Sequence, residues 1–153
     1  MEIKRLTTAD YHLVINLFDA YRVFYKYPSD IGLAERFIKA RLENNESVIF
    51  AAFEDGSEAP VGFTQLYPLI SSGRAIKNWV LNDLYVEPQY RKQGIGETLI
   101  KTAAEFAKAD GAAFLQLETA VDNYNAQRLY ENEGFVKQEP DPSFFVYRLP
   151  LIS

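Results

Sequence analysis

Residues 82–96 read Asn82-Asp83-Leu84-Tyr85-Val86-Glu87-Pro88-Gln89-Tyr90-Arg91-Lys92-Gln93-Gly94-Ile95-Gly96. They predict a β-strand that runs into a short turn and then into an α-helix. The apolar run up to Val86 is typical of a strand, and Pro88 ends it because proline has no N–H group for a sheet hydrogen bond. After Gly96 the apolar residues recur at helical spacing until Gly111, which predicts a long helix.

The turn before this helix has the features of an anion site. The first N–H groups of a helix have no partner within the helix and carry partial positive charge. Gly94 and Gly96 allow a ligand to approach the backbone closely, and Arg91 and Lys92 add full positive charges. We therefore expect residues 91–96 to bind a pyrophosphate. Glycines at such a turn can also serve the turn alone, so this pattern by itself leaves both interpretations open.

Two common phosphate-binding loops do not match this turn. A P-loop ends in Gly-Lys-Ser/Thr, and no such sequence follows Gly96. The dinucleotide fingerprint requires a third small residue where Leu99 stands. The sequence therefore argues against a nucleoside triphosphate on a P-loop and against a nicotinamide dinucleotide on a Rossmann turn.

The composition is that of one globular domain spanning residues 1–153. A chain of 153 residues is long enough for one core, and 48% hydrophobic and 24% charged residues are ordinary values. The sequence has no apolar run of membrane-spanning length, and its first six residues lack the apolar region of a signal peptide. We therefore expect a cytoplasmic protein that does not bind a membrane.

The residue types that are missing restrict the chemistry. Without cysteine the chain has no thiol nucleophile, no disulfide and no zinc–thiolate site. The single histidine, His12, lies in a helical pattern where a surface or capping role is the simpler interpretation, so we expect no metal site. Proton transfer then falls to carboxylates, tyrosines or water. The net charge of −5 argues against a nucleic-acid partner and is compatible with a cationic substrate.

The order of the predicted elements indicates a mixed α/β domain. Strands are expected at residues 2–6, 48–53, 61–67, 81–86, 114–119, 135–138 and 144–149. Four helices are expected, capped in turn by Thr8 or Asp10, by Ser29 or Asp30, by the glycine turn, and by Asn123. These elements give a central sheet of six to seven strands. The crossover through the long helix to residues 114–119 should be parallel and right-handed.

Asn123 and Tyr130 form a second group of interest. They are seven residues apart, or two helical turns, so both can lie on one face of the last helix. The amide can bond a polar ligand and the tyrosine hydroxyl can reach a reacting atom. Asparagine is also a frequent helix cap and tyrosine a frequent half-buried packing residue. Taken alone, each residue leaves both interpretations open.

Together, the two groups resemble motifs of the GNAT superfamily of N-acetyltransferases. Residues 91–96 look like its Arg/Gln-x-x-Gly-x-Gly/Ala acetyl-CoA motif, and residues 123–135 look like its Asn-x-x-Ala-x-x-Leu-Tyr-x-x-x-Gly-Phe motif. Residues 62–68, 79–84 and 118–123 are similar to the branch that contains the fungal histone, polyamine and D-amino-acid acetyltransferases and bacterial relatives. The resemblance covers essentially the whole chain. It is specific for acetyl-CoA and says little about the acceptor.

The resemblance implies a GNAT-like domain in which the central strand and its parallel neighbour splay apart around the pantetheine arm of acetyl-CoA. That arm would pair with the backbone of Leu84, Tyr85 and Val86. The pyrophosphate would rest on the N–H groups of Gln93, Gly94, Ile95 and Gly96. By matching position, Asn123 would contact the pantetheine arm and Tyr130 would lie near the sulfur. Acetyl would pass directly to a primary amine, which agrees with the absence of a cysteine to acylate.

The acceptor amine must lose a proton before it attacks. At pH 7 this costs roughly 4–5 kcal/mol for an amine of pKa about 10.4, so a carboxylate near the amine is expected. Strand alternation does not decide whether Asn82 or Asp83 faces the cleft. We expect Asp83 to be the base, with Glu118 as the alternative, and Asn82 to lie beside the acceptor. Tyr130 is the expected acid for the departing thiolate.

The acceptor side is less well defined. In the family it is lined by the loop that here contains Phe24, Tyr25 and Tyr27; these rings can hold an ammonium group or simply pack together. Trp79 is expected in the core. The predicted function is acetyl-CoA-dependent N-acetylation of a small primary amine, such as a polyamine or an amino acid, rather than of a protein lysine. The alternative is an acetyl-CoA-binding sensor without turnover. A homodimer is compatible with such a fold.

Overall fold

Five strands form one sheet in the order β1-β2-β3-β4-β5. The structure is a computed structural model that describes residues 1–152. The strands are β1 (Glu2–Arg5), β2 (Val48–Phe53), β3 (Pro60–Ser71), β4 (Ile76–Val86) and β5 (Leu115–Gln116). The α-helices are α1 (Ile15–Phe24), α2 (Ile31–Glu43), α3 (Ile95–Ala109) and α4 (Tyr124–Asn132), with short 3-10 helices η1 (Thr8–Val14) and η2 (Pro88–Tyr90). Neighbouring strands are antiparallel except β4 and β5, which are parallel. The predicted mixed α/β domain and its parallel pair are confirmed.

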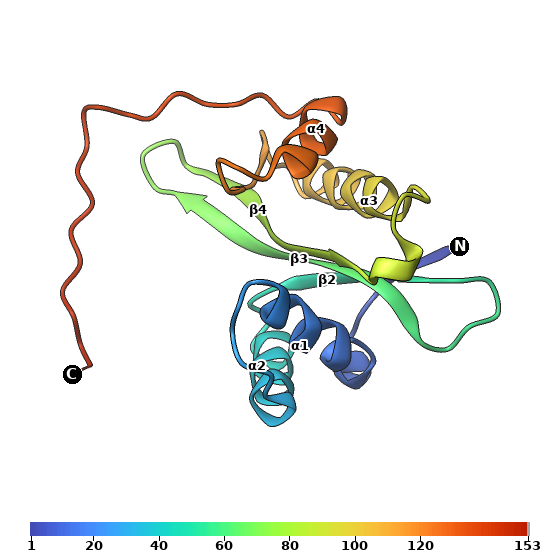
Figure 1. The fold of residues 1–153 in the computed structure, drawn as a ribbon. Coiled ribbons are helices and arrows are strands. Elements are labelled where there is room, and N and C mark those ends of the chain that lie inside the picture. Colours follow the sequence, from blue (N-terminus) through green and yellow to red (C-terminus); the bar gives the residue numbers. More distant parts are fainter. Residues whose placement is uncertain (153) are drawn as a thin grey trace.

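The sheet lies between two layers of helices. Helices α1 and α2 cover one face, and α3 covers the other with α4 beside it (Figure 1). Every residue of β2 is buried because both faces of the strand are covered. Ile49 and Ala51 pack in the core beneath α1 and α2, whereas Phe50 and Ala52 pack with Leu99 of α3. The sheet therefore separates two apolar cores.

The connection between α1 and α2 is held in place by buried Asp19. Its carboxylate accepts hydrogen bonds from the Ser29 hydroxyl at 2.6 Å and from the Asp30 N–H at 2.8 Å. Asp30 in turn caps α2, as expected, by accepting a bond from the helix's first turn at 3.1 Å. The first helical segment departs from prediction: Thr7 is its N-cap, with Asp10 accepting the Thr7 N–H at 2.9 Å, and it begins as the 3-10 helix η1.

A β-bulge interrupts the pairing of β3 with β4. Gln65 lies opposite Asp83 and Leu66 lies opposite Leu81, which leaves Asn82 without a partner. In a regular strand, successive side chains point to opposite faces. The extra residue shifts that alternation, so the usual rule does not place Asn82 and Asp83 on opposite sides.

The parallel pair is short. Only Trp79 with Leu115 and Val80 with Gln116 are in register. Within residues 1–152, no strand pairs with β4 at residues 81–86 on the β5 side, so this half of β4 has a free edge. Trp79 lies in the core as expected, 5% exposed.

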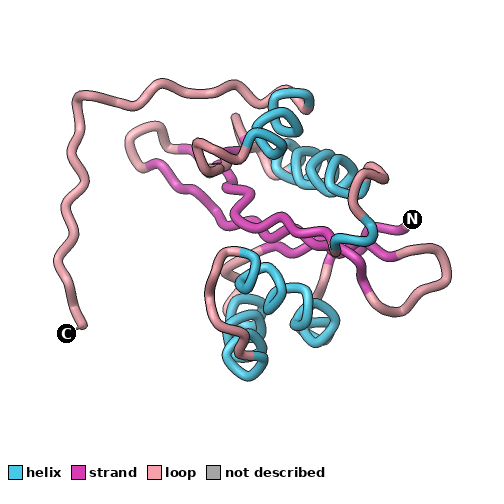
Figure 2. The backbone as a smooth tube through the Cα atoms, viewed as in Figure 1, coloured by secondary structure: helices cyan, strands magenta, loops and turns pink. Residues whose placement is uncertain are grey.

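The C-terminal part of the chain differs from prediction. Residues 135–138 and 144–149 form no strands, and the strand expected at 114–119 shortens to β5. Residues 135–152 instead leave α4 as an extended arm away from the body of the domain (Figures 1 and 2). A strand exists only where a neighbour pairs with it, and in the described chain these residues have none. The sheet therefore has five strands rather than six or seven.

Candidate active site

The start of α3 is open to a ligand. Gly94 is its N-cap with φ +82°, a left-handed conformation that favours glycine. In the described chain no side chain caps the helix, and the first backbone bond at its start runs from the Thr98 N–H to the Gly94 oxygen at 3.0 Å. A Cβ added at Gly94 would meet no atom of residues 1–152 within 4 Å. The expected cradle of Gln93, Gly94, Ile95 and Gly96 thus presents free main-chain N–H groups.

The two basic residues of this turn differ in their contacts. The Arg91 Nε donates to the Val86 oxygen at 2.8 Å, and the guanidinium lies over the rings of Tyr85 at 5.4 Å and Phe24 at 5.6 Å. These contacts tie Arg91 to the end of β4 and to α1. Lys92 is exposed, has φ +62°, and forms no ion pair with any described residue. Lys92 therefore offers the freer positive charge.

The free edge of β4 lies next to this cradle. Leu84, Tyr85 and Val86 are half-buried and pair with β3 on their other edge. An extended ligand can therefore add to the β5 side of β4 as another strand would. This is where the pantetheine arm was expected.

A cavity of about 510 Å³ opens on the α1 side of β4. It is lined by Phe18, Tyr21, Arg22, Tyr25, Tyr27, Phe37, Tyr67, Asn82 and Asp83. Asn82 and Asp83 both line it, next to the bulge that interrupts the regular alternation of β4. Phe24 lies outside the lining and is exposed, with its ring 5.2 Å from that of Tyr25.

Asp83 is 2% exposed, and its carboxylate accepts hydrogen bonds from two side-chain amides. The Gln65 amide donates to one carboxylate oxygen at 2.5 Å and the Asn82 amide to the other at 2.7 Å. The Tyr21 hydroxyl lies nearby and donates to the Asn82 main-chain oxygen at 3.3 Å. Burial raises the pKa of Asp83, and the neighbouring polar groups of Asn82, Gln65 and Tyr21 act in the opposite direction. Gln65 is itself oriented by the Ser47 hydroxyl, which donates to it at 2.8 Å.

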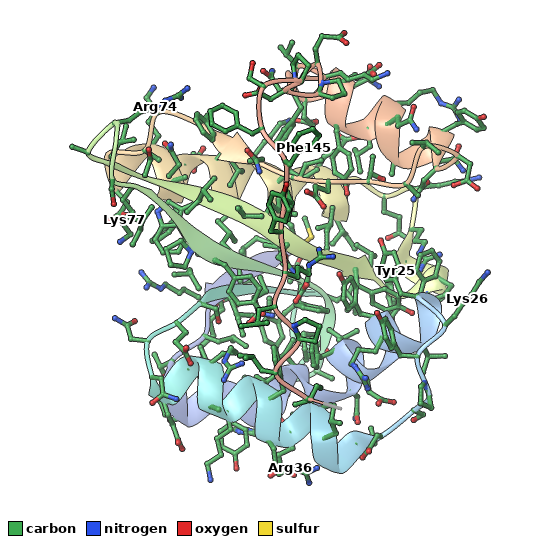
Figure 3. All side chains as sticks on the ribbon, turned by 90° about the vertical axis from the view of Figure 1, so that its left-hand side faces the viewer. Tyr25, Lys26, Arg36, Arg74, Lys77 and Phe145 are labelled. Carbon is green, nitrogen blue, oxygen red and sulfur yellow. The ribbon has the colours of Figure 1, made fainter. Side chains whose placement is uncertain are left out.

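Aromatic side chains form the wall of the cavity. The Tyr21 and Tyr25 rings lie 5.0 Å apart, and burial raises the pKa of Tyr21 and of Tyr67, so both hydroxyls stay protonated at neutral pH. Tyr25 ends α1 where that helix approaches the sheet (Figure 3). The Arg22 guanidinium lies 5.3 Å from the Tyr27 ring centre and supplies the positive charge of the lining. The cavity thus combines π faces, one carboxylate and one guanidinium.

A second cavity of about 680 Å³ adjoins the first. The two share Phe37, Tyr67 and Asn82. The second also contains Arg41 and Glu46, whose charged atoms lie 3.2 Å apart without hydrogen-bond geometry. Each cavity therefore carries one positive and one negative side chain.

Helix α4 brings the second motif toward this region. The Asn123 side chain caps the helix by accepting the Ala126 N–H at 3.2 Å, so the capping interpretation is seen directly. Tyr130 is half-buried against Phe135, with ring centres 5.8 Å apart. Burial raises the pKa of Tyr130 to about 12, with a smaller contribution from nearby Tyr25. Tyr130 is therefore a protonated hydroxyl close to the aromatic wall.

Several residues of the cavity were not predicted as site residues. No site role was expected for Tyr21, Arg22, Phe37 and Tyr67 in the lining, or for Gln65 behind Asp83. Their local sequence offers no signal, because only the packing of α1 and α2 on the sheet brings them together. Glu118, the alternative base, is exposed and lines neither cavity.

Among residues 1–152 no group of three or more His, Cys, Asp or Glu side chains could hold a metal ion. In the same part of the chain no helix has the length and apolar character needed to cross a membrane.

Comparisons with known proteins agree with the motifs. The profile of the family described as "Acetyltransferase (GNAT) family" matches residues 14–135. A Bacillus subtilis protein named "Uncharacterized N-acetyltransferase YhfO" is 44% identical over 97% of each chain. The thialysine N-epsilon-acetyltransferase of Caenorhabditis elegans is 28% identical over 97% of this chain and 91% of that protein.

The fold is also found among solved structures. The crystal structure of a probable acetyltransferase has a TM-score of 0.87 and 36% identity, and covers 100% of this chain and 99% of its own. An aminoglycoside acetyltransferase from a soil metagenome, 21% identical with a TM-score of 0.77, shares the fold. The chain is a member of the GNAT family of N-acetyltransferases, enzymes that use acetyl-CoA as co-substrate.

Proposed function

We propose that this N-acetyltransferase transfers acetyl from acetyl-CoA to the primary amine of a small molecule that also carries a carboxylate, as an amino acid with a side-chain amine does. The observation that carries this proposal is the cavity on the α1 side of β4, where Asp83 forms the floor and Arg22 lies in the lining. A carboxylate and aromatic faces suit an ammonium group. A guanidinium suits a carboxylate.

The charge balance favours a zwitterionic acceptor over a polyamine. Asp83 and Arg22 balance in the first cavity, as Glu46 and Arg41 do in the second. A polyamine carries several positive charges and would require an excess of carboxylates to offset its desolvation. Thialysine, the acceptor in the name of the relatives from Caenorhabditis elegans and Bos taurus, has both an amine and a carboxylate.

The residues present fit acetyl-CoA at the opposite side of β4. The open N–H groups at the start of α3 and Lys92 would hold its pyrophosphate, and the free edge of residues 84–86 would pair with its pantetheine arm. When bound there, the co-substrate supplies an activated acetyl thioester. The side-chain N–H groups of Asn123 would be available to donate to that arm, because only the side-chain oxygen takes part in capping α4.

Asp83 and Tyr130 would divide the proton transfers. The Asp83 carboxylate, oriented by Gln65 and Asn82, would take the proton of the ammonium group, directly or through a water. Removal of that proton costs roughly 4–5 kcal/mol at pH 7, which a buried carboxylate with a raised pKa offsets in part. Tyr130, protonated below about pH 12, would donate to the departing sulfur.

A matched pair of acceptors tests the substrate class. Release of free coenzyme A thiol would be measured with lysine and thialysine against diamines of equal length that lack the carboxylate. We expect the amino acids to have at least a ~10-fold higher kcat/KM, the equivalent of about 1.4 kcal/mol from one charge-assisted contact. Arg22→Gln should abolish this preference and retain activity on the diamines.

Other outcomes would reject the proposal. A diamine or polyamine used as well as the amino acids would show that Arg22 does not read a carboxylate. Faster transfer to peptide lysines would point to a protein acceptor. Tight acetyl-CoA binding with no turnover on any amine would favour the sensor.

A further inference from the structure

The second cavity, of about 680 Å³, extends the space next to Asp83. It shares Phe37, Tyr67 and Asn82 with the first cavity. Burial raises the pKa of Tyr67, and smaller effects come from Asp83 in the first cavity and from Arg41 and Glu46 in the second. The Tyr67 hydroxyl therefore lies close to the charged groups of both cavities.

The end of α2 holds Arg41 and Glu46 side by side. Asn45 has φ +52°, the left-handed conformation that ends many helices. The Glu46 N–H donates to the Arg41 oxygen at 2.9 Å and the Asn45 N–H donates to the Leu42 oxygen at 3.2 Å, which together form a Schellman motif. The two positions that this motif brings into contact commonly carry apolar side chains. Here they carry opposite charges, and both side chains line the second cavity.

The Arg41 guanidinium is held in place but has free donors. It lies 4.5 Å from the centre of the Phe37 ring, which in turn stacks on Phe18 with ring centres 5.4 Å apart. The Arg41 Nε is 3.2 Å from a Glu46 oxygen without hydrogen-bond geometry, and this buried nitrogen has no hydrogen-bond partner among residues 1–152. A planar guanidinium with unused N–H groups is suited to two parallel bonds with a carboxylate.

The adjacent charges of Arg41 and Glu46 match an α-amino acid group. That group carries an ammonium and a carboxylate on one carbon atom, so its two charges are also neighbours. Arg41 suits the carboxylate, and Glu46 suits the ammonium. Asp83 and Arg22 offer the same combination in the first cavity. The two cavities together are therefore complementary to a molecule with an amino acid group at each end.

We propose that Arg41 and Glu46 bind a second α-amino acid group at the far end of the acceptor, so that the preferred acceptor class is a diamino dicarboxylic acid. This inference rests on the function proposed above, in which Asp83 receives the reacting amine and Arg22 its carboxylate. The chain that joins the two ends would lie along the Phe37 and Tyr67 rings. The reacting nitrogen loses a proton and forms an amide bond with the acetyl carbon, the carbon–sulfur bond breaks, and coenzyme A leaves as the thiol.

Two acceptors that differ by one carboxylate test the role of Arg41. Lysine is 2,6-diaminopimelic acid without one of its carboxylates. We expect kcat/KM, measured by release of coenzyme A thiol, to be at least ~10-fold higher for diaminopimelic acid, whose two equivalent ends alone account for only about two-fold. Arg41→Gln should remove the preference beyond this two-fold. Arg36→Gln is the matched control and should retain it, because Arg36 is exposed on the same helix and points away from the sheet (Figure 3).

A second pair tests Glu46. 2-Aminopimelic acid is diaminopimelic acid without one of its amines, so it keeps the far carboxylate and lacks the far ammonium. The wild type should prefer diaminopimelic acid by more than about two-fold, and Glu46→Gln should remove the excess. Circular dichroism would verify that each variant is folded. If Arg41→Gln does not fold, Arg41→Lys takes its place, because lysine keeps the charge and lacks the planar pair of donors.

The outcomes distinguish this inference from the proposed function. A wild-type preference for diaminopimelic acid over lysine of about two-fold or less, or a larger preference that Arg41→Gln leaves unchanged, would overturn the second site. Lysine used no better than a diamine would count against the proposed function instead. If no amine is acetylated, calorimetry with free coenzyme A, which has no acetyl group to transfer, gives the same comparison as affinities. Equal affinities for diaminopimelic acid in the wild type and in Arg41→Gln would then overturn the second site.

Discussion

Replacement of Asp83 by asparagine removes the charge at the cavity floor while keeping its volume. In the wild type the carboxylate accepts from Gln65 and Asn82 at 2.5 and 2.7 Å and lines the space proposed for the amine. Loss of a general base lowers rates by about 10²–10⁴-fold. We expect about 10²-fold in kcat/KM for the acceptor, since water can still accept the proton. This corresponds to about 2.7 kcal/mol of transition-state stabilisation.

The substitution should lower kcat/KM for the acceptor and leave the affinity for acetyl-CoA unchanged. Thiol release at saturating acetyl-CoA would give kcat and the acceptor KM, and calorimetry would give the affinity for acetyl-CoA, which should be unchanged. Glu118→Gln is the comparison because Glu118 is the alternative base, exposed and outside both cavities. Wild-type kcat/KM in Asp83→Asn together with a large loss in Glu118→Gln would refute the assignment.

The same variant changes the pH dependence of stability. Burial raises the pKa of Asp83 above its ordinary value, so its protonation favours the folded state. That contribution is complete below the unfolded pKa and is lost as pH rises through the folded pKa. Asparagine has no such proton. The free energy of unfolding would be measured by urea denaturation for both proteins. As pH rises above about 4, the value for the variant should increase relative to that of the wild type.

Three further substitutions probe the remaining parts of the site. Tyr130→Phe should lower kcat by about 10²-fold at unchanged acetyl-CoA affinity; wild-type turnover with transfer still rate-limiting would remove this hydroxyl from the mechanism. Gly94→Ala should cost about 1–2 kcal/mol of stability because of its φ of +82°, and should weaken acetyl-CoA binding in calorimetry; unchanged binding would contradict the cradle. Gln65→Leu leaves Asp83 and Ser47 without their buried partner and should cost about 1–3 kcal/mol in urea unfolding; an unchanged midpoint would show that this chain of bonds is dispensable.

The parts of the fold predicted from sequence are those that local chemistry decides. Gly94 marks the start of α3 because its backbone requires a left-handed conformation, and Asp30 and Asn123 mark helix starts because their side chains accept bonds from the first turn. The hairpin of β2 and β3 follows from two apolar runs joined by a turn. In each case the residues that determine the feature are close together in the chain.

What the sequence did not reveal depends on distant partners. The orientation of Asn82 follows from a register shift against β3, which no residue near it announces. Tyr21 becomes part of the cavity wall only because α1 packs over β4. The strands expected at residues 135–138 and 144–149 have the composition of strands. A strand also requires a neighbour to pair with, which composition does not identify.

The short contact between β4 and β5 has a consequence for motion. Two register pairs join these strands, and no residue of α4 is fully buried. Amide protons of residues 115–132 should therefore exchange with solvent sooner than those of β2, whose every residue is buried. The side of the molecule that bears Tyr130 should thus open to solvent more readily than the centre of the sheet.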